Sequence, residues 1–402
     1  QQQALVPVLR FSEFEGEWER NELDEICEKI QDGTHFSPET LSNGDYKYIT
    51  SKNIRNHGLD LSNIAYLSEE EHKKIYKRCN VRYQDVLITK DGASTGNVCL
   101  NSLKEEFSLL SSVAFIRANK EKATNQFIYQ LILAPRGQAQ VKGVKSGQAI
   151  KRITLSKLKK FRFHFPSLPE QQKIASFLSS IDQKIQQLRQ KVALLEQYKK
   201  GVMQQLFSLA LRFKDEDGRD FGDWEEKELK DFCTINPRTT TLPTTFIYID
   251  LESVEDGFLV KENKIHHSNA PSRAKRVLEK NDVLFQTVRP YQKNNFYFDR
   301  TDSCVASTGY ALLRTKENTK YLYYSIHIPS FVNKVILRCT GSNYPAINST
   351  DLSTIKLPLP CIEEQQKIAT ILTQLDQKID QARQQLTQTE QYKKGLLQQL
   401  LV

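Results

Sequence analysis

The sequence predicts an α+β protein in which two similar α+β modules are separated by two long helices, and the helices pair as an antiparallel coiled coil with pseudo-twofold symmetry. Three observations predict this arrangement. One stretch of about 38 residues occurs twice, apolar residues recur in it at heptad spacing, and short motifs outside it return in the same order.

The duplicated stretch is an internal repeat. Residues 170–207 align without a gap with residues 364–401, with roughly 23 identities in about 38 positions. Neither copy contains proline, and residues that favour helices (Gln, Lys, Leu and Glu) dominate both. Each copy therefore predicts one helix of about 57 Å, at a rise of 1.5 Å per residue.

Apolar residues in both copies are spaced alternately by three and four, which predicts a coiled-coil seam. A lysine interrupts the seam at the same place in each copy, Lys199 in the first and Lys393 in the second. Two unrelated surface helices are the alternative, but a strict heptad period over this length favours pairing. If a pseudo-twofold axis relates the halves, the helices run antiparallel. The predicted seam residues are Ile174, Leu178, Ile181, Ile185, Leu188, Leu195, Ile368, Leu372, Leu375 and Ile379.

The repeat extends into the segments between the helices. Leu9-Arg10-Phe11 followed by Trp18 returns as Leu211-Arg212-Phe213 followed by Trp224. Short runs rich in Val, Ile, Tyr and Phe, punctuated by Gly, Asn and Asp, predict strands with a few helices among them. The predicted domains are residues 1–165 (first module), 166–210 (first long helix), 211–223 (a charged linker), 224–360 (second module) and 361–402 (second long helix).

Composition indicates a basic protein with reduced thiols. The formal net charge is +9 and the pI about 9.0, which favours a nucleic-acid partner. Residues 142–162 carry several lysines and arginines with no acid between them, which favours contact with phosphates; a solvated basic face is the alternative. Seven cysteines without a CxxC pair indicate a cytoplasmic location, and no apolar run is long enough to cross a membrane.

Sequence motifs of catalysis are absent. The chain has no P-loop, no Rossmann glycine motif and no G-x-S-x-G elbow. Asn236-Pro237-Arg238-Thr239 is not the Asn-Pro-Pro-aromatic loop that an amino-methyltransferase needs, and no carboxylates and lysines are spaced as in a nuclease. We therefore expect a chain that is not an enzyme by itself and that holds no cofactor or metal of its own.

The sequence resembles the specificity subunits of type I restriction–modification systems. Two doubled motifs carry the resemblance, Pro-x-x-x-Glu-Gln-Gln-Lys-Ile-Ala (166–175 and 360–369) and Glu-Gln-Tyr-Lys-Lys-Gly (196–201 and 390–395). The two Trp-headed modules and the loop Asp32-Gly33-Thr34-His35 add to it. The resemblance covers essentially the whole chain; its helix motifs are specific and the module loops are less so.

This resemblance implies how the chain works. The modules would be two target-recognition domains, each reading one half of a split sequence in double-stranded DNA, and the paired helices would be a ruler for the unread spacer. The helices and adjacent surfaces would dock two methyltransferase subunits, and restriction subunits would join the full complex. S-adenosylmethionine, ATP and Mg²⁺ are expected on those partner subunits, with no membrane involved.

Loop side chains that can reach base edges in the major groove are the candidate DNA-binding residues. Tyr291 and Tyr344 could instead pack at the edge of the core. The glycines at 147 and 341 could instead serve only to form turns. The candidates in the first module are Thr34, His35, Lys47, Lys90, Ser94, Lys145, Gln148 and Arg152. Those in the second are Arg238, Arg289, Tyr291, Lys293, Asn343 and Tyr344.

Three other functions are compatible with parts of this pattern. A bivalent DNA-bridging protein would act without a methyltransferase. An enzyme with an unrecognised motif would turn over DNA without partners. A coiled-coil scaffold has no need of two different sets of loops, which argues against it.

Overall fold

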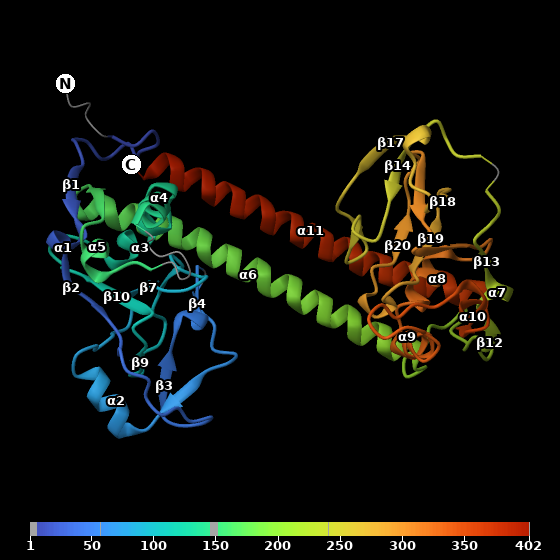
Figure 1. Cartoon of the computed structure of the whole chain (residues 1–402), viewed down its shortest axis with the longest axis horizontal. Helices are drawn as coiled ribbons and strands as arrows, with labels where there is room; N and C mark the ends of the chain where they lie inside the picture. Colours follow the sequence, from blue (N-terminus) through green and yellow to red (C-terminus); the bar gives the residue numbers. More distant parts are fainter. Residues whose placement is uncertain (1–5, 57, 145–151, 240, 402) are drawn as a thin grey trace. The chain divides into compact units, whose positions relative to one another are not determined.

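The computed structural model describes residues 6–56, 58–144, 152–239 and 241–401. It divides into two compact units, Gln1–Lys191 with Ala382–Val402 (unit 1) and Val192–Gln381 (unit 2). Both long helices, α6 (Leu168–Phe207) and α11 (Ile362–Leu400), cross this division. Each unit therefore holds one module, part of α6 and part of α11 (Figure 1).

Unit 1 contains a four-stranded antiparallel sheet and smaller sheets around it. The four strands lie in the order β2-β10-β7-β8, the three-stranded sheet has the order β6-β3-β9, and β1 pairs with β11 and β4 with β5. The strands are β1 (Glu19–Glu22), β2 (Cys27–Asp32), β3 (Tyr46–Ile49), β4 (Ile54–Arg55), β5 (Gly58–Leu59), β6 (Ala65–Leu67), β7 (Val86–Thr89), β8 (Val98–Leu100), β9 (Ser108–Leu109), β10 (Val113–Ala118) and β11 (Arg162–Phe165). The helices are α1 (Leu23–Ile26), η1 (Ser51–Asn53), α2 (Glu69–Tyr76), α3 (Asn125–Leu133), α4 (Pro135–Val144) and α5 (Leu155–Lys159).

Unit 2 repeats this topology. Its central sheet has the order β13-β22-β19-β20, and its second sheet, β17-β14-β21-β18, has one more strand than its counterpart. In both second sheets the first strand in chain order pairs in parallel with the last one, β3 with β9 and β14 with β21. The strands are β12 (Glu225–Glu228), β13 (Thr234–Ile235), β14 (Thr245–Ile249), β15 (Val254–Glu255), β16 (Phe258–Leu259), β17 (Asn263–His266), β18 (Ala274–Val277), β19 (Asp282–Gln286), β20 (Phe296–Phe298), β21 (Cys304–Ser307), β22 (Tyr310–Arg314) and β23 (Lys356–Leu359). The helices are α7 (Leu229–Phe232), η2 (His267–Asn269), η3 (Pro290–Gln292), α8 (Thr319–Ser325), α9 (Pro329–Ile336) and α10 (Ser349–Ser353).

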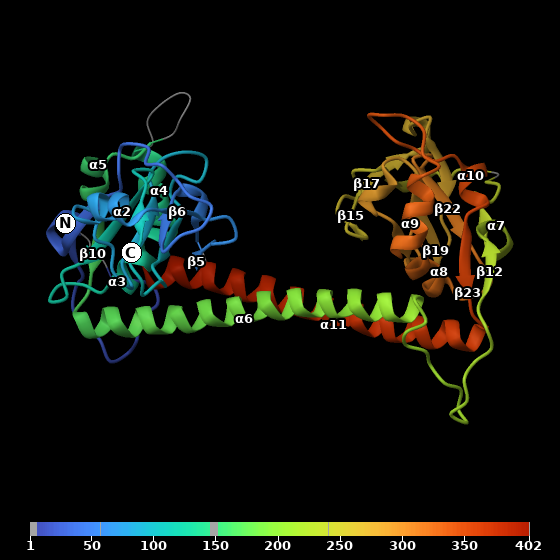
Figure 2. The ribbon, with the colours of Figure 1, turned by 90° about the horizontal axis from the view of Figure 1, so that it is seen from below.

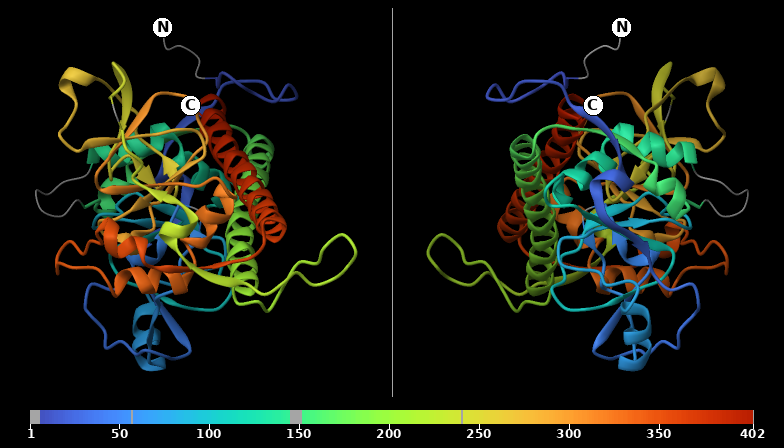
Figure 3. Two further views of the ribbon diagram at one scale, coloured as in Figure 1. Left: turned by 90° about the vertical axis from the view of Figure 1, so that its right-hand side faces the viewer. Right: turned by 90° about the vertical axis from the view of Figure 1, so that its left-hand side faces the viewer.

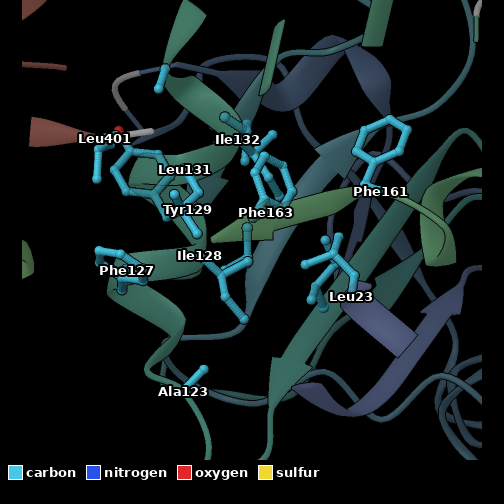
Figure 4. Packing of buried hydrophobic residues seen from close by; sticks show 14 of the residues in the cluster. Leu23, Ala123, Phe127, Ile128, Tyr129, Leu131, Ile132, Phe161, Phe163 and Leu401 are labelled. Carbon is cyan, nitrogen blue, oxygen red and sulfur yellow. The ribbon is translucent and has the colours of Figure 1, made fainter. Parts of the chain in front are cut away.

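Strands β10 and β22, which lie inside the central sheets, are apolar except for one arginine each, Arg117 and Arg314, because each strand separates two cores. Successive side chains of a strand point to opposite faces of the sheet. Ala114 and Ile116 of β10 therefore pack with α3 and α6, as Figure 4 shows for neighbouring residues of this core, whereas Val113 and Phe115 pack into the second core with β3 and β9. The alternation returns in β22, whose residues divide between the two cores of unit 2.

The repeated Glu-Gln-Gln motif fastens the start of each long helix to its module. Glu170 is buried and accepts hydrogen bonds from Arg10 Nε and Nη2, both at 2.7 Å. Glu364 accepts the same pair of bonds from Arg212, at 3.2 and 2.8 Å. The Leu-Arg-Phe motif and the helix motif, which the sequence shows only as separate repeats, therefore meet in both units.

Residues of α6 and α11 pack against each other within each unit. In unit 1, Asp182 accepts a hydrogen bond from Lys393 (2.5 Å), and Arg189, further along α6, pairs with Glu390, earlier in α11 (2.6 Å). The two segments in this unit therefore run in opposite directions. In unit 2 the equivalent pair is Lys199 with Asp376, also at 2.5 Å. The predicted seam residues are all buried except Leu195, which is half-buried.

The segment between α6 and β12 is part of unit 2 and extends as a loop away from the end of α6 (Figures 2 and 3). It contains a turn in which the amide of Asp215 donates to the carbonyl of Arg219 at 2.9 Å. The linker predicted at 211–223 falls in this segment.

Gln171 of the Glu-Gln-Gln motif allows a test of how strongly the start of α6 is held to its module. Its side chain is buried; Nε2 donates to the carbonyls of Lys122 (3.0 Å) and Pro166 (2.9 Å), and Oε1 accepts from the amide of Thr124 (3.3 Å). Gln171→Ala leaves these buried groups unsatisfied, so we expect unit 1 to lose about 2 to 3 kcal/mol of stability in urea unfolding. Gln172→Ala, at the exposed neighbouring position, is the matched control and should stay within about 0.5 kcal/mol of the parent. Equal effects of the two substitutions would contradict the anchoring role.

Candidate nucleic-acid interface

Some of the predicted loop residues lie where β7 and β10 in unit 1, and β19 and β22 in unit 2, meet their loops. In unit 1 the amide of Lys90, directly after β7, donates to the carbonyl of Ser112 (2.7 Å), and its carbonyl accepts from the amide of Ile153 (2.9 Å). In unit 2 Thr287, directly after β19, makes the same two bonds with Gly309 and Ile347, both at 3.0 Å. One backbone frame therefore presents two different sets of side chains.

In unit 1 this frame surrounds a buried carboxylate. Asp32 lies at the end of β2, and its oxygens lie 3.2 Å from Nε2 of His35, 3.3 Å from Nη2 of Arg78 and 3.4 Å from Nζ of Lys90. Asp91 continues the cluster, 3.5 Å from Lys90 Nζ. The structure thus brings together His35 and Lys90 from two predicted loops.

Lys90 corrects one of the predictions. Its side chain is only 1% exposed and lies between Asp32 and Asp91, so it cannot reach a base in this conformation. Thr34 is also buried, and its Oγ1 accepts from the amide of Phe36 at 3.3 Å. Both residues shape the loops from within, whereas His35 is exposed.

The other candidates of unit 1 are scattered. Arg152 is exposed and its Nε lies 3.2 Å from Asp91 Oδ1, so it lies beside the cluster. Lys47 lies on β3 and pairs with Glu105 at 2.9 Å, and no interaction of the described residues joins it to the cluster. Ser94 donates to the carbonyl of Ser51 (3.2 Å) and lines a polar recess of about 600 Å³ with Lys52, Asn53 and Arg55. Lys145 and Gln148 lie outside the described residues.

In unit 2 the predicted residues gather on two adjoining loops. The guanidinium of Arg289 lies 4.2 Å from the ring centroid of Tyr344, and the amide of Arg289 donates to the carbonyl of Pro345 at 2.7 Å. Tyr291 is half exposed, at 50%, and Lys293 is exposed on the same turn. Two further candidates are exposed, Asn343 beside Tyr344 and Arg238 on the loop after β13.

No group of three or more His, Cys, Asp and Glu side chains in the described ranges is placed to hold a metal ion. Burial raises the pKa of the Cys79, Cys99 and Cys233 thiols to about 12, so these side chains are protonated at neutral pH. Within the same ranges no helix is long and apolar enough to cross a membrane.

Comparison with known proteins decides the family. The family model described as the type I restriction modification DNA specificity domain matches twice, over residues 15–197 and 222–391. The chain belongs to the family of type I restriction–modification DNA specificity proteins. A Methanocaldococcus jannaschii protein provisionally assigned as the MjaX specificity subunit of a type I restriction enzyme is 26% identical in an alignment of 406 positions that covers 97% of this chain and 94% of that protein.

Two further comparisons agree with this assignment. The type I restriction enzyme MjaVIII specificity subunit of the same organism is 24% identical over 359 residues, 84% of this chain and 83% of its own length. The crystal structure of a type I restriction–modification S subunit from M. genitalium shares the fold, with a TM-score of 0.65, 18% identity and 99% of each chain covered. The chain is therefore a specificity subunit of a type I restriction–modification system.

Sequence reasoning missed several polar residues of the specificity subunit's loops. Asp32 was recognised only as part of a motif, and Arg78, which also donates to the carbonyl of Gly33 at 2.8 Å, was not noticed. In unit 2, Gln286 donates from Nε2 to the carbonyl of Val288 and to Gln292 Oε1, both at 2.8 Å. The signal for Gln286 is its polarity directly after the apolar run Val283-Leu284-Phe285 of β19.

Half-buried His327 supports the loop that carries Arg289 through its neighbours. The carbonyl of Tyr323 lies 2.6 Å from Nδ1 of His327, and Nε2 lies 3.3 Å from the amide nitrogen of Asn295, whose Oδ1 accepts from the amide of Gln286 at 2.8 Å. A neutral ring with its proton on Nδ1 satisfies both contacts. Burial lowers the pKa of His327 to about 4.

The pH dependence of unit 2 should report this histidine. An unfolded chain binds a proton at this histidine below about pH 6.5, whereas the folded protein does not until about pH 4. We therefore expect stability to fall as the pH drops through this window, by on the order of 3 kcal/mol in total from this group. His327→Gln should reduce the slope in urea unfolding measured from pH 7 to 4, while His266→Gln, at an exposed position, should leave it unchanged. Identical slopes for His327→Gln and the parent would contradict the assignment.

Proposed function

We propose that this specificity subunit reads a bipartite target in double-stranded DNA, with each module recognising one half. The observation that carries the proposal is that the two modules share one backbone arrangement but differ in the side chains of their loops. The strand order and the backbone bonds of the two central sheets match, but the side chains that follow the matching strands differ: Lys90 after β7 corresponds to Thr287 after β19, and Gly92 corresponds to Arg289. Identical frames with different side chains are what two readers of different sequences require.

The long helices would set the length of the unread spacer by pairing as an antiparallel coiled coil related by a pseudo-twofold axis. The matching pairs Asp182–Lys393 in unit 1 and Lys199–Asp376 in unit 2 support this register, since a polar contact at a seam, here partly buried, favours one alignment of two helices. Each aspartate is also held by its module, Asp182 by Gln130 Nε2 at 2.9 Å and Asp376 by the hydroxyl of Tyr324 at 2.7 Å. These contacts would transmit the position of the helix pair to each reading surface.

The chain would act without catalysis of its own and would dock two methyltransferase subunits that bind S-adenosylmethionine. A repeated exposed feature supports two like partners: Tyr198 and Tyr392, at the same position of the Glu-Gln-Tyr-Lys-Lys-Gly motif, are 61% and 58% exposed. Large aromatic side chains exposed on a helix are typical of protein interfaces. Restriction subunits that use ATP and Mg²⁺ would complete the assembly.

Mapping of methylated adenines tests the proposed function. The full chain is produced with its cognate methyltransferase subunit in a host without other adenine methylation, and the methylated positions of the genome are determined. We expect one split sequence with a fixed unread spacer, and no methylation without the chain. A continuous methylated sequence, or methylation that does not depend on the chain, would overturn the proposal.

A further inference from the structure

We infer that Arg289, stacked on Tyr344, reads a guanine in the half-site of unit 2; this rests on the proposed function. The guanidinium of Arg289 lies 4.2 Å from the Tyr344 ring centroid, and Tyr344 is 65% exposed. A ring that holds a guanidinium in one plane at the surface restricts the orientations it can adopt. Arginine is the side chain that most often makes paired hydrogen bonds to O6 and N7 of guanine.

The first step of the argument is the charge of Arg289. Throughout the described part of unit 2, no carboxylate forms an ion pair with it and its guanidinium has no hydrogen bond. The Nε atom is buried without a partner, while the residue as a whole is half-buried. The Nη end is therefore the part of the guanidinium left to face outward, and it carries the two donors that a guanine edge accepts.

The second step is the backbone at this position. Arg289 has φ +55° and ψ +52°, a left-handed conformation that costs free energy for any residue with a Cβ. The equivalent position of unit 1, two residues after the corresponding Lys90, is Gly92, with φ +98° and open space around a built Cβ. The fold therefore needs a left-handed residue here and accepts glycine without strain. A strained arginine where the sister module has glycine points to a use for its side chain.

The third step is the rigidity of the loop. The amide of Arg289 donates to the carbonyl of Pro345 at 2.7 Å, and Val288 and Ala346 form an isolated antiparallel bridge, so the loops that carry Arg289 and Tyr344 are joined through their backbones. The buried side chain of Gln286 stabilises the turn by donating hydrogen bonds to the carbonyl of Val288 and to Oε1 of Gln292. A side chain on such a rigid loop loses little conformational entropy when it binds DNA.

Lys293 provides a matched comparison on the same turn. It is exposed, it is also left-handed, with φ +58°, and no aromatic ring among the described residues stacks with it. A single mobile ammonium group is suited to phosphate, a contact that carries no sequence information. Comparing variants of Arg289 and Lys293 therefore distinguishes the loss of a contact to a base from the loss of a positive charge near phosphate.

The experiment compares Arg289→Gly and Lys293→Gly in the full chain with its methyltransferase subunit, on duplexes in which each base of the two half-sites is varied in turn. For the parent we expect guanine, or its paired cytosine, to be required at one position of one half-site. Arg289→Gly should lower discrimination at that position alone by about 5- to 150-fold, the 1–3 kcal/mol range of a bidentate pair. Lys293→Gly should lower methylation evenly over all duplexes and reduce its salt dependence.

Thermal melting checks that the Arg289→Gly protein is folded. Glycine relieves the left-handed strain at this position, so we expect no substantial fall in the melting temperature. Tyr344→Phe should retain the base preference, since the ring face persists, whereas Tyr344→Ala should weaken it. Unchanged base preference in Arg289→Gly, or an even loss over all duplexes as in Lys293→Gly, would overturn the inference. If the parent methylates no split sequence, the proposed function fails instead.

Discussion

Exchanging residues 12–165 for the corresponding module of another specificity subunit is expected to replace one half of the methylated sequence and leave the other half unchanged. The first and last strands of the module make this exchange feasible. In unit 1, β1 and β11 pair antiparallel, with Glu19 opposite Phe165 and Glu22 opposite Arg162. The chain therefore enters and leaves the module at adjacent points, and the two cores of the module lie between them.

The Arg10–Glu170 anchorage of the helix survives this exchange because both partners lie outside the exchanged segment, whereas the backbone partners of Gln171 at Lys122 and Thr124 are exchanged with the module. Arg10 and Glu170 flank residues 12–165 on either side, so their paired hydrogen bonds remain. The reciprocal exchange of residues 218–360 is the control and should alter only the opposite half, since β12 and β23 close the second module in the same way. Methylated adenines are mapped for both chimeras. A change in both halves after either exchange would show that the modules do not read independently.

Much of the architecture follows from two features of the sequence, the spacing of apolar residues and the internal repeat. Long helices without proline and short apolar strands can be located from spacing alone, and the strand orders of the two modules match because the repeat fixes both. The bounds of α6, Leu168–Phe207, lie close to the predicted 166–210. The division of each long helix between two units has no local signal, because it depends on contacts such as Asp182 with Lys393.

The loop residues were harder to predict because their roles depend on distant partners. Lys90 carries a charge and follows a strand, which suggests an exposed contact residue, yet Asp32 and Asp91 hold it in the interior. A buried lysine needs such partners, and a sequence does not show that they are near. Arg289 shows the opposite case, in which a charged residue next to proline stays without a carboxylate partner in the described part of its unit.

Removing one heptad from each long helix is expected to shorten the unread spacer while leaving both half-sites unchanged. Residues 187–193 and 381–387 are the segments to remove, because they are equivalent in the repeat and keep the seam in phase. Seven residues span about 10 Å of helix, and one base pair rises about 3.4 Å, so the preferred spacer should shorten by up to about 3 base pairs. The reason is the proposed role of the helix pair as a ruler: a shorter pair brings the readers closer.

The design keeps the contacts that define each unit. Asp182 with Lys393 and Lys199 with Asp376 all lie outside the removed segments, whereas Arg189 is lost with its ion pair to Glu390. Methylation of a library of duplexes with spacers of different lengths measures the preference. Removing residues 187–193 alone is the control and should lower the melting temperature and methylation together, because the remaining seam residues of α6 and α11 can no longer all be in register. An unchanged spacer in a doubly shortened protein that melts like its parent would mean that something other than the helix pair sets the distance between the half-sites.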